Sequence, residues 1–339
     1  MKKAVVCLAL TAVLGLSGLP LSACSQTQEI RVYMPDGAPA IAMAGVLNSD
    51  SENDGVSYFV VKPTLISSKV NFKDQSQNAD VCILPLTAAA KLLGSGQNYQ
   101  TIGTITNGNL YLISNQGVQY SKQNLSALVG ETLGVLQLAN VPGLTVKAVF
   151  AQNGLGDSYA TLSGAPLADK INLKGITDGQ AGEVEGVNTY LLAEPAATAI
   201  CTKKASEGYQ IVGDLQALYG EGEGYPQAVI VVKNSLLQSR LEWVNSFVQQ
   251  VRVSTDFAFR AAADTLVQLI NAHLEDDTSQ STLQAATLSE QVRSRLGIGF
   301  RAVSQSKAQM QAYLQEVYQI DNSFGIPQEA FYCSIALGE

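Results

Sequence analysis

The sequence is poor in the residues on which most catalytic and metal sites depend. Among its 339 residues there is one histidine, His273, and its five cysteines lie far apart with no CxxC pair. Ser-His-Asp and Cys-His catalysis need a histidine beside the nucleophile, and structural zinc sites need clustered Cys or His ligands. His273 stands in a C-terminal region with helical periodicity, beside acidic residues typical of a solvated helix end. We therefore predict neither an enzyme nor a metal site.

Signals for nucleotide or nucleic-acid binding are also missing. No GxGxxG follows a predicted strand into a helix and no GxxxxGK[ST] occurs, so we predict no cofactor. Charged residues make up only 15% of the chain and the net charge is −8. Binding to nucleic acid requires a basic face that releases counterions from phosphate, and nucleic acids are therefore excluded as partners.

The first part of the chain has the pattern of a sorting signal. Lys2 and Lys3 precede a mostly apolar run at 4–19, which is followed by Leu21-Ser22-Ala23-Cys24. A basic start and a short apolar run are typical of a secretory signal peptide, and the run is too short for a stable membrane span. Leu-Ser-Ala-Cys is similar to the bacterial lipoprotein box, in which the cysteine is acylated. An ordinary signal peptidase site with an incidental cysteine is the alternative.

We accordingly predict a signal peptide at 1–23 and a tether at 24–29 that is lipidated on Cys24. Two or more acyl chains anchor a protein stably where one does not. The expected location is the extracytoplasmic face of the cell membrane, with contact through the lipid anchor alone. Cys82, Cys201 and Cys333 are then the remaining cysteines; one long-range disulfide among them stays open.

Extended and helical patterns alternate through the rest of the chain. Strands are predicted at 30–34, 58–62, 79–84, 100–105, 110–114, 133–136, 159–162, 189–193, 209–212 and 228–232, and helices at 86–93, 144–153 and 195–204. After Asn234 we predict helices only, including one long helix with an apolar stripe from Leu237 to Val251 and another from Met310 to Val317. Alternation of this kind predicts a mostly parallel sheet with helices on both faces.

The order of these elements predicts an α/β protein of two domains. The chain would cross between them near 110–117 and near 221–227, so that domain 1 consists of 30–112 and 228–339 and domain 2 of 113–227. In such folds ligands bind outside the carboxyl ends of the strands, in a cleft between the domains. Hinge closure about the two crossings would enclose the ligand.

Four segments carry a resemblance to a known family: Tyr33-Met34-Pro35-Asp36-Gly37-Ala38-Pro39, Ala79-Asp80-Val81 with Pro85, the run from Leu128 to Val135, and Ala193-Glu194-Pro195-Ala196. With the lipoprotein box, the chain resembles the solute-binding receptors of ABC importers, in the group that serves nitrate, sulfonate, taurine and thiamine-precursor pyrimidines. The resemblance implies a type II periplasmic-binding-protein-like fold, a monomer, a small-molecule ligand, and permease and ATPase subunits as partners. A secreted enzyme of the same fold with thiamine-pyrimidine chemistry, and a receptor serving a sensor, are the alternatives.

The resemblance also implies where the ligand binds. The contacts would come from the loop after the first strand, the start of the helix after the third, and the matching loops of the second domain. The residues at these positions are Met34, Asp36, Gly37, Ala38, Pro39, Thr87, Asn107, Gly108, Asn109, Asn140, Pro142, Gly143, Thr145, Glu194 and Tyr225. Backbone N–H groups at helix starts can hold an anion, and the hydroxyl and amide side chains can donate or accept. The alternative role for each Thr and Asn is to cap a helix or close a turn.

Glu194 bears on the charge of the ligand. A carboxylate facing the cleft would favour a donor-rich or cationic group such as an aminopyrimidine, and no Arg or Lys stands in these loops to hold an oxyanion in a bidentate way. The other interpretation is that Glu194 caps the helix that begins at Pro195. Tyr225 also has two interpretations: it stacks on a ring of the ligand, or it packs inside the protein.

Overall fold

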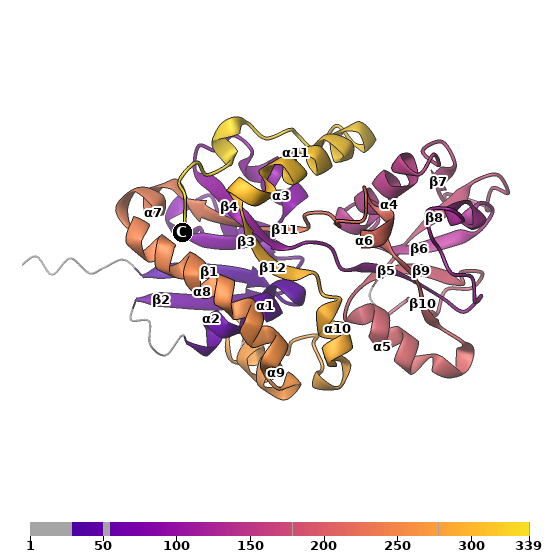
Figure 1. Cartoon of the computed structure of the whole chain (residues 1–339), viewed down its shortest axis with the longest axis horizontal. Coiled ribbons are helices and arrows are strands. Elements are labelled where there is room, and N and C mark those ends of the chain that lie inside the picture. Colours follow the sequence, from indigo (N-terminus) through magenta and orange to yellow (C-terminus); the bar gives the residue numbers. More distant parts are fainter. Residues whose placement is uncertain (1–28, 50–54, 178, 277, 339) are drawn as a thin grey trace, which may run out of the picture.

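The computed structural model describes residues 29–49, 55–177, 179–276 and 278–338. The predicted signal peptide, Cys24 and most of the tether lie outside the described residues. The described chain forms two α/β lobes, each built on a six-stranded sheet (Figure 1). Within the described ranges no helix is long and apolar enough to cross a membrane.

Lobe A contains both ends of the described chain. Its sheet has the order β12-β4-β11-β3-β1-β2. The strands are β1 (Ile30–Pro35), β2 (Val56–Val61), β3 (Val81–Pro85), β4 (Tyr99–Thr106), β11 (Ala228–Lys233) and β12 (Ile298–Ala302). Helices α1 (Ala38–Ala42), α2 (Ala44–Asn48), α8 (Leu241–Arg260), α9 (Ala263–Ala272) and α10 (Glu290–Ser294) lie on one face; α3 (Leu86–Leu93) and α11 (Val303–Ile320) lie on the other (Figure 1). Helix α7 (Asn234–Ser239) joins β11 to α8.

Lobe B is formed by the middle of the chain. Its sheet has the order β10-β5-β9-β6-β8-β7. The strands are β5 (Leu110–Ser114), β6 (Thr132–Leu136), β7 (Tyr159–Thr161), β8 (Ile171–Ile176), β9 (Thr189–Ala193) and β10 (Gln210–Asp214), and the helices are α4 (Val141–Gln152), α5 (Ala196–Lys203) and α6 (Leu215–Leu218).

Both sheets are mixed, which corrects the prediction of a mostly parallel sheet. In lobe A, β11 runs antiparallel to β3 and β4, and β12 antiparallel to β4. In lobe B, β5 runs antiparallel to β9 and β10. The physical reason lies in the crossings: β5 and β11 each start at the lobe junction because the chain has just arrived there, whereas β3 and β9 end at it.

The chain passes between the lobes at 107–109 and at 219–227. The first crossing comes ahead of the boundary expected between 112 and 113, because Leu110–Ser114 pairs with β9 and β10 of lobe B. The second crossing ends at the start of β11. Crossings this short make the lobe junction a place where loops of both lobes meet.

Two further differences from the predictions concern strands and one helix. The strands β8 and β12 were not predicted, and β12 interrupts a region expected to be purely helical. The long helix predicted from its apolar stripe is divided at Arg240 into α7 and α8, although Val244, Val248 and Val251 are buried as the stripe requires. Cys82, Cys201 and Cys333 are free thiols, so no disulfide joins them.

Candidate binding site at the lobe junction

The loop between β1 and α1 is organised by the side chain of Asp36. Its carboxylate accepts hydrogen bonds from the Gly37 N–H (2.9 Å), from Ser281 Oγ (2.7 Å) and from the N–H and Oγ1 of Thr282 (2.8 and 2.9 Å). Gly37 has φ +106°, a conformation that only glycine adopts at little cost. The carboxylate is thus engaged within lobe A, and what the loop offers to a ligand is its backbone. Met34 is fully buried in the core of lobe A.

The predicted hydroxyl contacts differ from one another in their surroundings. Thr87, in the first turn of α3, is buried. Thr145 is completely buried in α4, where its Oγ1 lies 2.8 Å from the hydroxyl of Tyr313 on α11. This hydrogen bond joins the two lobes, so the Thr145 hydroxyl serves the interface between α4 and α11.

The start of α4 is shaped by a close backbone contact. A Cβ on Gly143 would lie 1.8 Å from the carbonyl oxygen of Leu138, so only glycine fits there. Pro142 stands in the first turn, where its missing N–H is no loss. Asn140 is at the N-cap, but its exposed side chain makes no capping hydrogen bond. The alternative role of Asn140 was to cap this helix. Its side chain does not do so, and its amide can therefore contact a ligand.

The first crossing is held by hydrogen bonds on both sides. Asn107 Nδ2 donates to the Gly299 carbonyl (3.0 Å), and the Asn107 N–H donates to the Gly297 carbonyl (2.7 Å). Asn109 Nδ2 donates to the carbonyl of Glu194 (3.2 Å), whose own N–H donates to the Asn109 carbonyl (2.9 Å). The segment from Gly297 to Gly299 is therefore hydrogen-bonded to the first crossing.

The polar groups of Tyr225 and Glu194 have partners within the protein. Tyr225 is fully buried and stacks on Tyr313 with ring centroids 6.0 Å apart, which supports packing over stacking on a ligand. The Glu194 carboxylate accepts from the N–H and Oγ1 of Thr198 (3.0 and 2.7 Å), so it does hold the start of α5. Its Oε1 also lies 2.8 Å from Nη2 of Arg295, in lobe A.

Arg295 places a cation beside Glu194, although none stands in the loops predicted to hold the ligand. Its guanidinium also donates to Thr198 Oγ1 (2.7 Å) and lies 5.8 Å from the ring centroid of Tyr111, while its carbonyl accepts from the Tyr111 hydroxyl (3.2 Å). This contact could not be predicted from the sequence, because Arg295 lies in a region expected to be helical. The turn between α10 and β12 brings it to the junction. The carboxylate of Glu194 is therefore neutralised by a partner from the opposite lobe.

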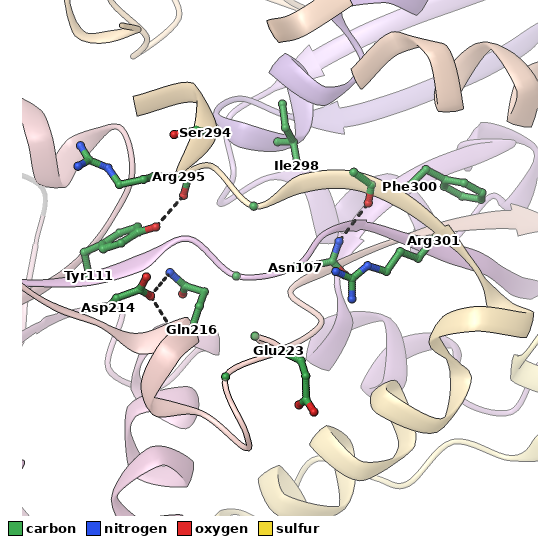
Figure 2. A pocket seen from close by; sticks show the side chains of 15 residues that line it. Asn107, Tyr111, Asp214, Gln216, Glu223, Ser294, Arg295, Ile298, Phe300 and Arg301 are labelled. Carbon is green, nitrogen blue, oxygen red and sulfur yellow. Dashed lines mark hydrogen bonds between the residues drawn. The ribbon is translucent and has the colours of Figure 1, made fainter. Parts of the chain in front are cut away.

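A pocket of about 400 Å³ opens beside this ion pair (Figure 2). Both lobes and the second crossing line it, with Asn107, Gly108, Tyr111, Asp214, Gln216, Gly222, Glu223, Gly224, Ser294, Arg295, Gly297, Ile298, Gly299, Phe300 and Arg301. We call it the hinge pocket. It lies at the β12 and β10 edges of the two sheets, whereas the loops after β1, β3, β6 and β9 lie toward the other side of the first crossing. Of the predicted residues it includes only Asn107 and Gly108.

Asp214 is a half-buried acid that lines the hinge pocket. It caps α6, accepting from the N–H groups of Gln216 (2.8 Å) and Ala217 (3.4 Å). Burial raises the pKa of its carboxyl, although these hydrogen bonds and Arg295 act in the opposite direction. The pocket is therefore a polar hollow whose walls belong to both lobes.

Comparisons with known proteins agree with this geometry. No protein-family model matches the sequence, and no curated protein does. Among solved structures, an ABC transporter protein from Parabacteroides distasonis superposes with a TM-score of 0.68 at 19% identity, over 91% of this chain and 99% of the other. The periplasmic aliphatic sulphonate-binding protein of Escherichia coli gives 0.61 at 11% identity, over 87% and 88%. The periplasmic nitrate-binding protein of Synechocystis PCC 6803 gives 0.57 at 8% identity, over 87% and 82%.

The chain has the periplasmic-binding-protein-like fold.

Within this fold, the structure brings most of the predicted residues to the lobe junction. The loops holding Asp36 to Pro39 and Thr87 come from lobe A, those holding Asn140 to Thr145 and Glu194 come from lobe B, and Asn107 to Asn109 form the crossing between them. The residues that sequence reasoning missed are Arg295 and Tyr313, both from the C-terminal part of lobe A. Both contact residues of lobe B, and helical periodicity alone does not predict contacts between lobes.

Proposed function

We propose that this protein is the extracytoplasmic substrate-binding component of an ABC importer. It would bind a small organic solute at the lobe junction, enclose it by movement of the lobes, and deliver it to a permease. The observation that carries the proposal is the junction itself: two crossings join two α/β lobes, and polar loops of both lobes meet at the ends of their parallel strands. Two solved structures with the same fold support it: one is named as the ligand-binding component of an ABC-type import system, and the other as a periplasmic sulphonate-binding protein.

The solute site that we propose is formed by the loops after β1, β3, β6 and β9 together with the first crossing. The groups it can use are the backbone at 36–39 and at the start of α3, the hydroxyl of Thr87, and the amides of Asn109 and Asn140. Asp36, Thr145, Glu194 and Tyr225 act mainly by holding these loops in place, because their polar groups already have partners within the protein.

Attachment to the membrane through Cys24 is part of the proposal. A lipid on this cysteine and the short polar segment after it would keep lobe A near the membrane surface, where a permease is reached. The test is membrane fractionation of cells that express the Cys24→Ser variant. Release of the variant into the soluble extracytoplasmic fraction is expected, and membrane retention equal to that of the wild type would contradict the anchor.

Solute binding is tested by a thermal-shift screen of the purified full-length chain. The panel contains thiamine precursors, aminopyrimidines, riboflavin, taurine, alkanesulfonates and nitrate. A solute at 100 times its Kd stabilises the folded state by about 2.7 kcal/mol, which raises the melting temperature by several degrees. A concentration-dependent rise with one chemical class supports the proposal, and no rise with any compound, at concentrations up to about 10 mM, would count against it.

A further inference from the structure

Some buried polar atoms at the lobe junction have no hydrogen-bond partner within the described chain. In the described part of the chain, seven buried side-chain nitrogen and oxygen atoms have no hydrogen-bond partner, and three of them are Asn109 Oδ1, Gln227 Oε1 and Arg295 Nε. Almost all buried polar groups in folded proteins are paired, since an unpaired one loses its hydrogen bonds to water without replacement. Such atoms at a proposed binding site indicate a partner from outside the chain.

Asn109 offers an acceptor whose identity is fixed by its surroundings. The residue is 3% exposed and stands at the end of the first crossing. Its Nδ2 donates to the carbonyl of Glu194 at 3.2 Å, which assigns the other amide atom as the oxygen. Asn109 Oδ1 can therefore only accept, and it calls for an N–H or O–H group.

Gln227, on the other crossing, carries a second unpaired amide oxygen, Oε1. It is the last residue before β11, and its N–H donates to the carbonyl of Thr106 at the end of β4 (3.0 Å). Its carbonyl accepts from the N–H of Leu86 at the start of α3 (2.9 Å). The backbone of Gln227 is thus fixed between the first crossing and the helix start that carries Thr87. The residue was not among those predicted from the sequence to contact a ligand.

We infer that Asn109 and Gln227 select a solute that carries hydrogen-bond donors. The inference rests on the proposed function and specifies its substrate class: compounds with N–H or O–H groups, such as an amine, an amide or an aminopyrimidine, over donor-free oxyanions such as nitrate or ethanesulfonate. Because Arg295 already neutralises Glu194, the solute need not be cationic.

Two probe pairs, in each of which one member lacks the N–H donors of the other, test the inference. Taurine is compared with ethanesulfonate, and 4-aminopyrimidine with 4-(dimethylamino)pyrimidine, by thermal shift on the full-length chain. The donor-bearing member of at least one pair is expected to raise the melting temperature by about 2 °C or more, and its partner is expected to give a much smaller shift. Equal shifts within the pairs would overturn the inference, with water as the partner of these atoms, and would leave the proposed function standing. No shift with any donor-bearing probe would also overturn it.

The variant Gln227→Met separates a binding role from a structural one. It keeps the length of the side chain and removes the acceptor, so affinity for the donor-bearing probe should fall about tenfold. Gln227→Glu, which keeps an acceptor oxygen, should bind that probe more tightly than Gln227→Met. Without any probe, Gln227→Met should melt at or above the wild-type temperature, because it removes an unpaired buried atom. A lower melting temperature, or wild-type affinity in Gln227→Met, would contradict the assignment.

Discussion

Glu194 of lobe B and Arg295 of lobe A form an ion pair across the lobe junction, with Oε1 and Nη2 2.8 Å apart. The Glu194 side chain is 0% exposed and the Arg295 side chain 24% exposed. Removal of one partner from such a pair leaves the other charge buried without compensation, which costs more than the pair itself contributes. The pair therefore ties the position of the lobes to the start of α5.

The ion pair predicts strong coupling between its two residues. Arg295→Ala should lower the free energy of unfolding by about 2 kcal/mol, a value reduced from that of a fully buried pair because the arginine is partly exposed. Glu194→Gln in the Arg295→Ala background should restore part of the loss, and urea denaturation in a double-mutant cycle measures it. Arg301→Ala, which removes an exposed arginine of the same segment, is the matched control and should change stability little. Additive effects of Arg295→Ala and Glu194→Gln would contradict the coupling.

A second contact between the lobes is the hydrogen bond of Thr145 with Tyr313. Tyr313→Phe should lower the free energy of unfolding by about 1 to 2 kcal/mol, because the Thr145 hydroxyl then remains buried without a partner. Combining Tyr313→Phe with Thr145→Val should bring stability back toward the wild type, since both polar groups are then gone. Urea denaturation of the three variants checks this. A double variant less stable than either single variant would show that the hydroxyls are held by other groups.

The close packing of the first crossing predicts an intolerant glycine. A Cβ on Gly297 would lie 1.8 Å from the carbonyl oxygen of Gly108, and Gly297 has φ +63°. Gly297→Ala should therefore destabilise the protein by about 3 kcal/mol or more, or force the β12 segment away from the crossing. Gly325→Ala, with no heavy atom within 4 Å of the added Cβ, is the control. Thermal denaturation and small-angle scattering of both variants decide this, and equal stability of the two would contradict it.

The pH dependence of stability should report Asp214. Burial raises the pKa of this carboxyl in the folded state, so its contribution to stability is fully present below the unfolded value near 4 and is lost as the pH rises through the folded value. Asn can still cap α6 and does not ionise. The difference in unfolding free energy, Asp214→Asn minus wild type, should thus increase from pH 4 to pH 7.

Asp74 provides a control of opposite sign for this measurement. Hydrogen bonds from Ser76 lower the pKa of its carboxyl, so its contribution is present above the unfolded value and is lost as the pH falls through the folded one. For Asp74→Asn the same difference should decrease as the pH rises from 3 to 5. Urea denaturation of both variants and the wild type from pH 3 to pH 7 measures the two differences. A difference for Asp214→Asn that is flat or falls with pH would show that burial does not control its ionisation.

The sequence predicted the elements that have strong local signals. The strands at 110–114 and 189–193 and the helix at 86–93 are confirmed at both ends, because apolar runs there are bounded by turn residues or proline. The strand β12 was missed, because Ile298–Ala302 is short, contains glycine and runs directly into α11. Its pairing with β4 depends on contacts between segments nearly 200 residues apart, which periodicity does not report.

The candidate site was predicted as a set of loops but not as a set of contacts. Two of these positions need glycine: Gly37 has φ +106°, and a Cβ on Gly143 would meet the carbonyl oxygen of Leu138. The partners of Glu194 and Thr145 could not be read in this way, since Arg295 and Tyr313 arrive from distant parts of the chain. Sequence reasoning therefore located the junction and left open which of its polar groups are already paired.

The most direct test of the central claim is to measure solute affinity in variants on both sides of the junction. With the compound that gives the largest thermal shift, titration calorimetry compares the wild type with Thr87→Val in lobe A and Asn140→Ala in lobe B. Thr161→Ala on the distant strand β7 is the control. If the solute binds between the lobes, each junction variant should bind it about tenfold more weakly while Thr161→Ala binds it as the wild type does. Wild-type affinity in both junction variants would place the solute elsewhere and contradict the account.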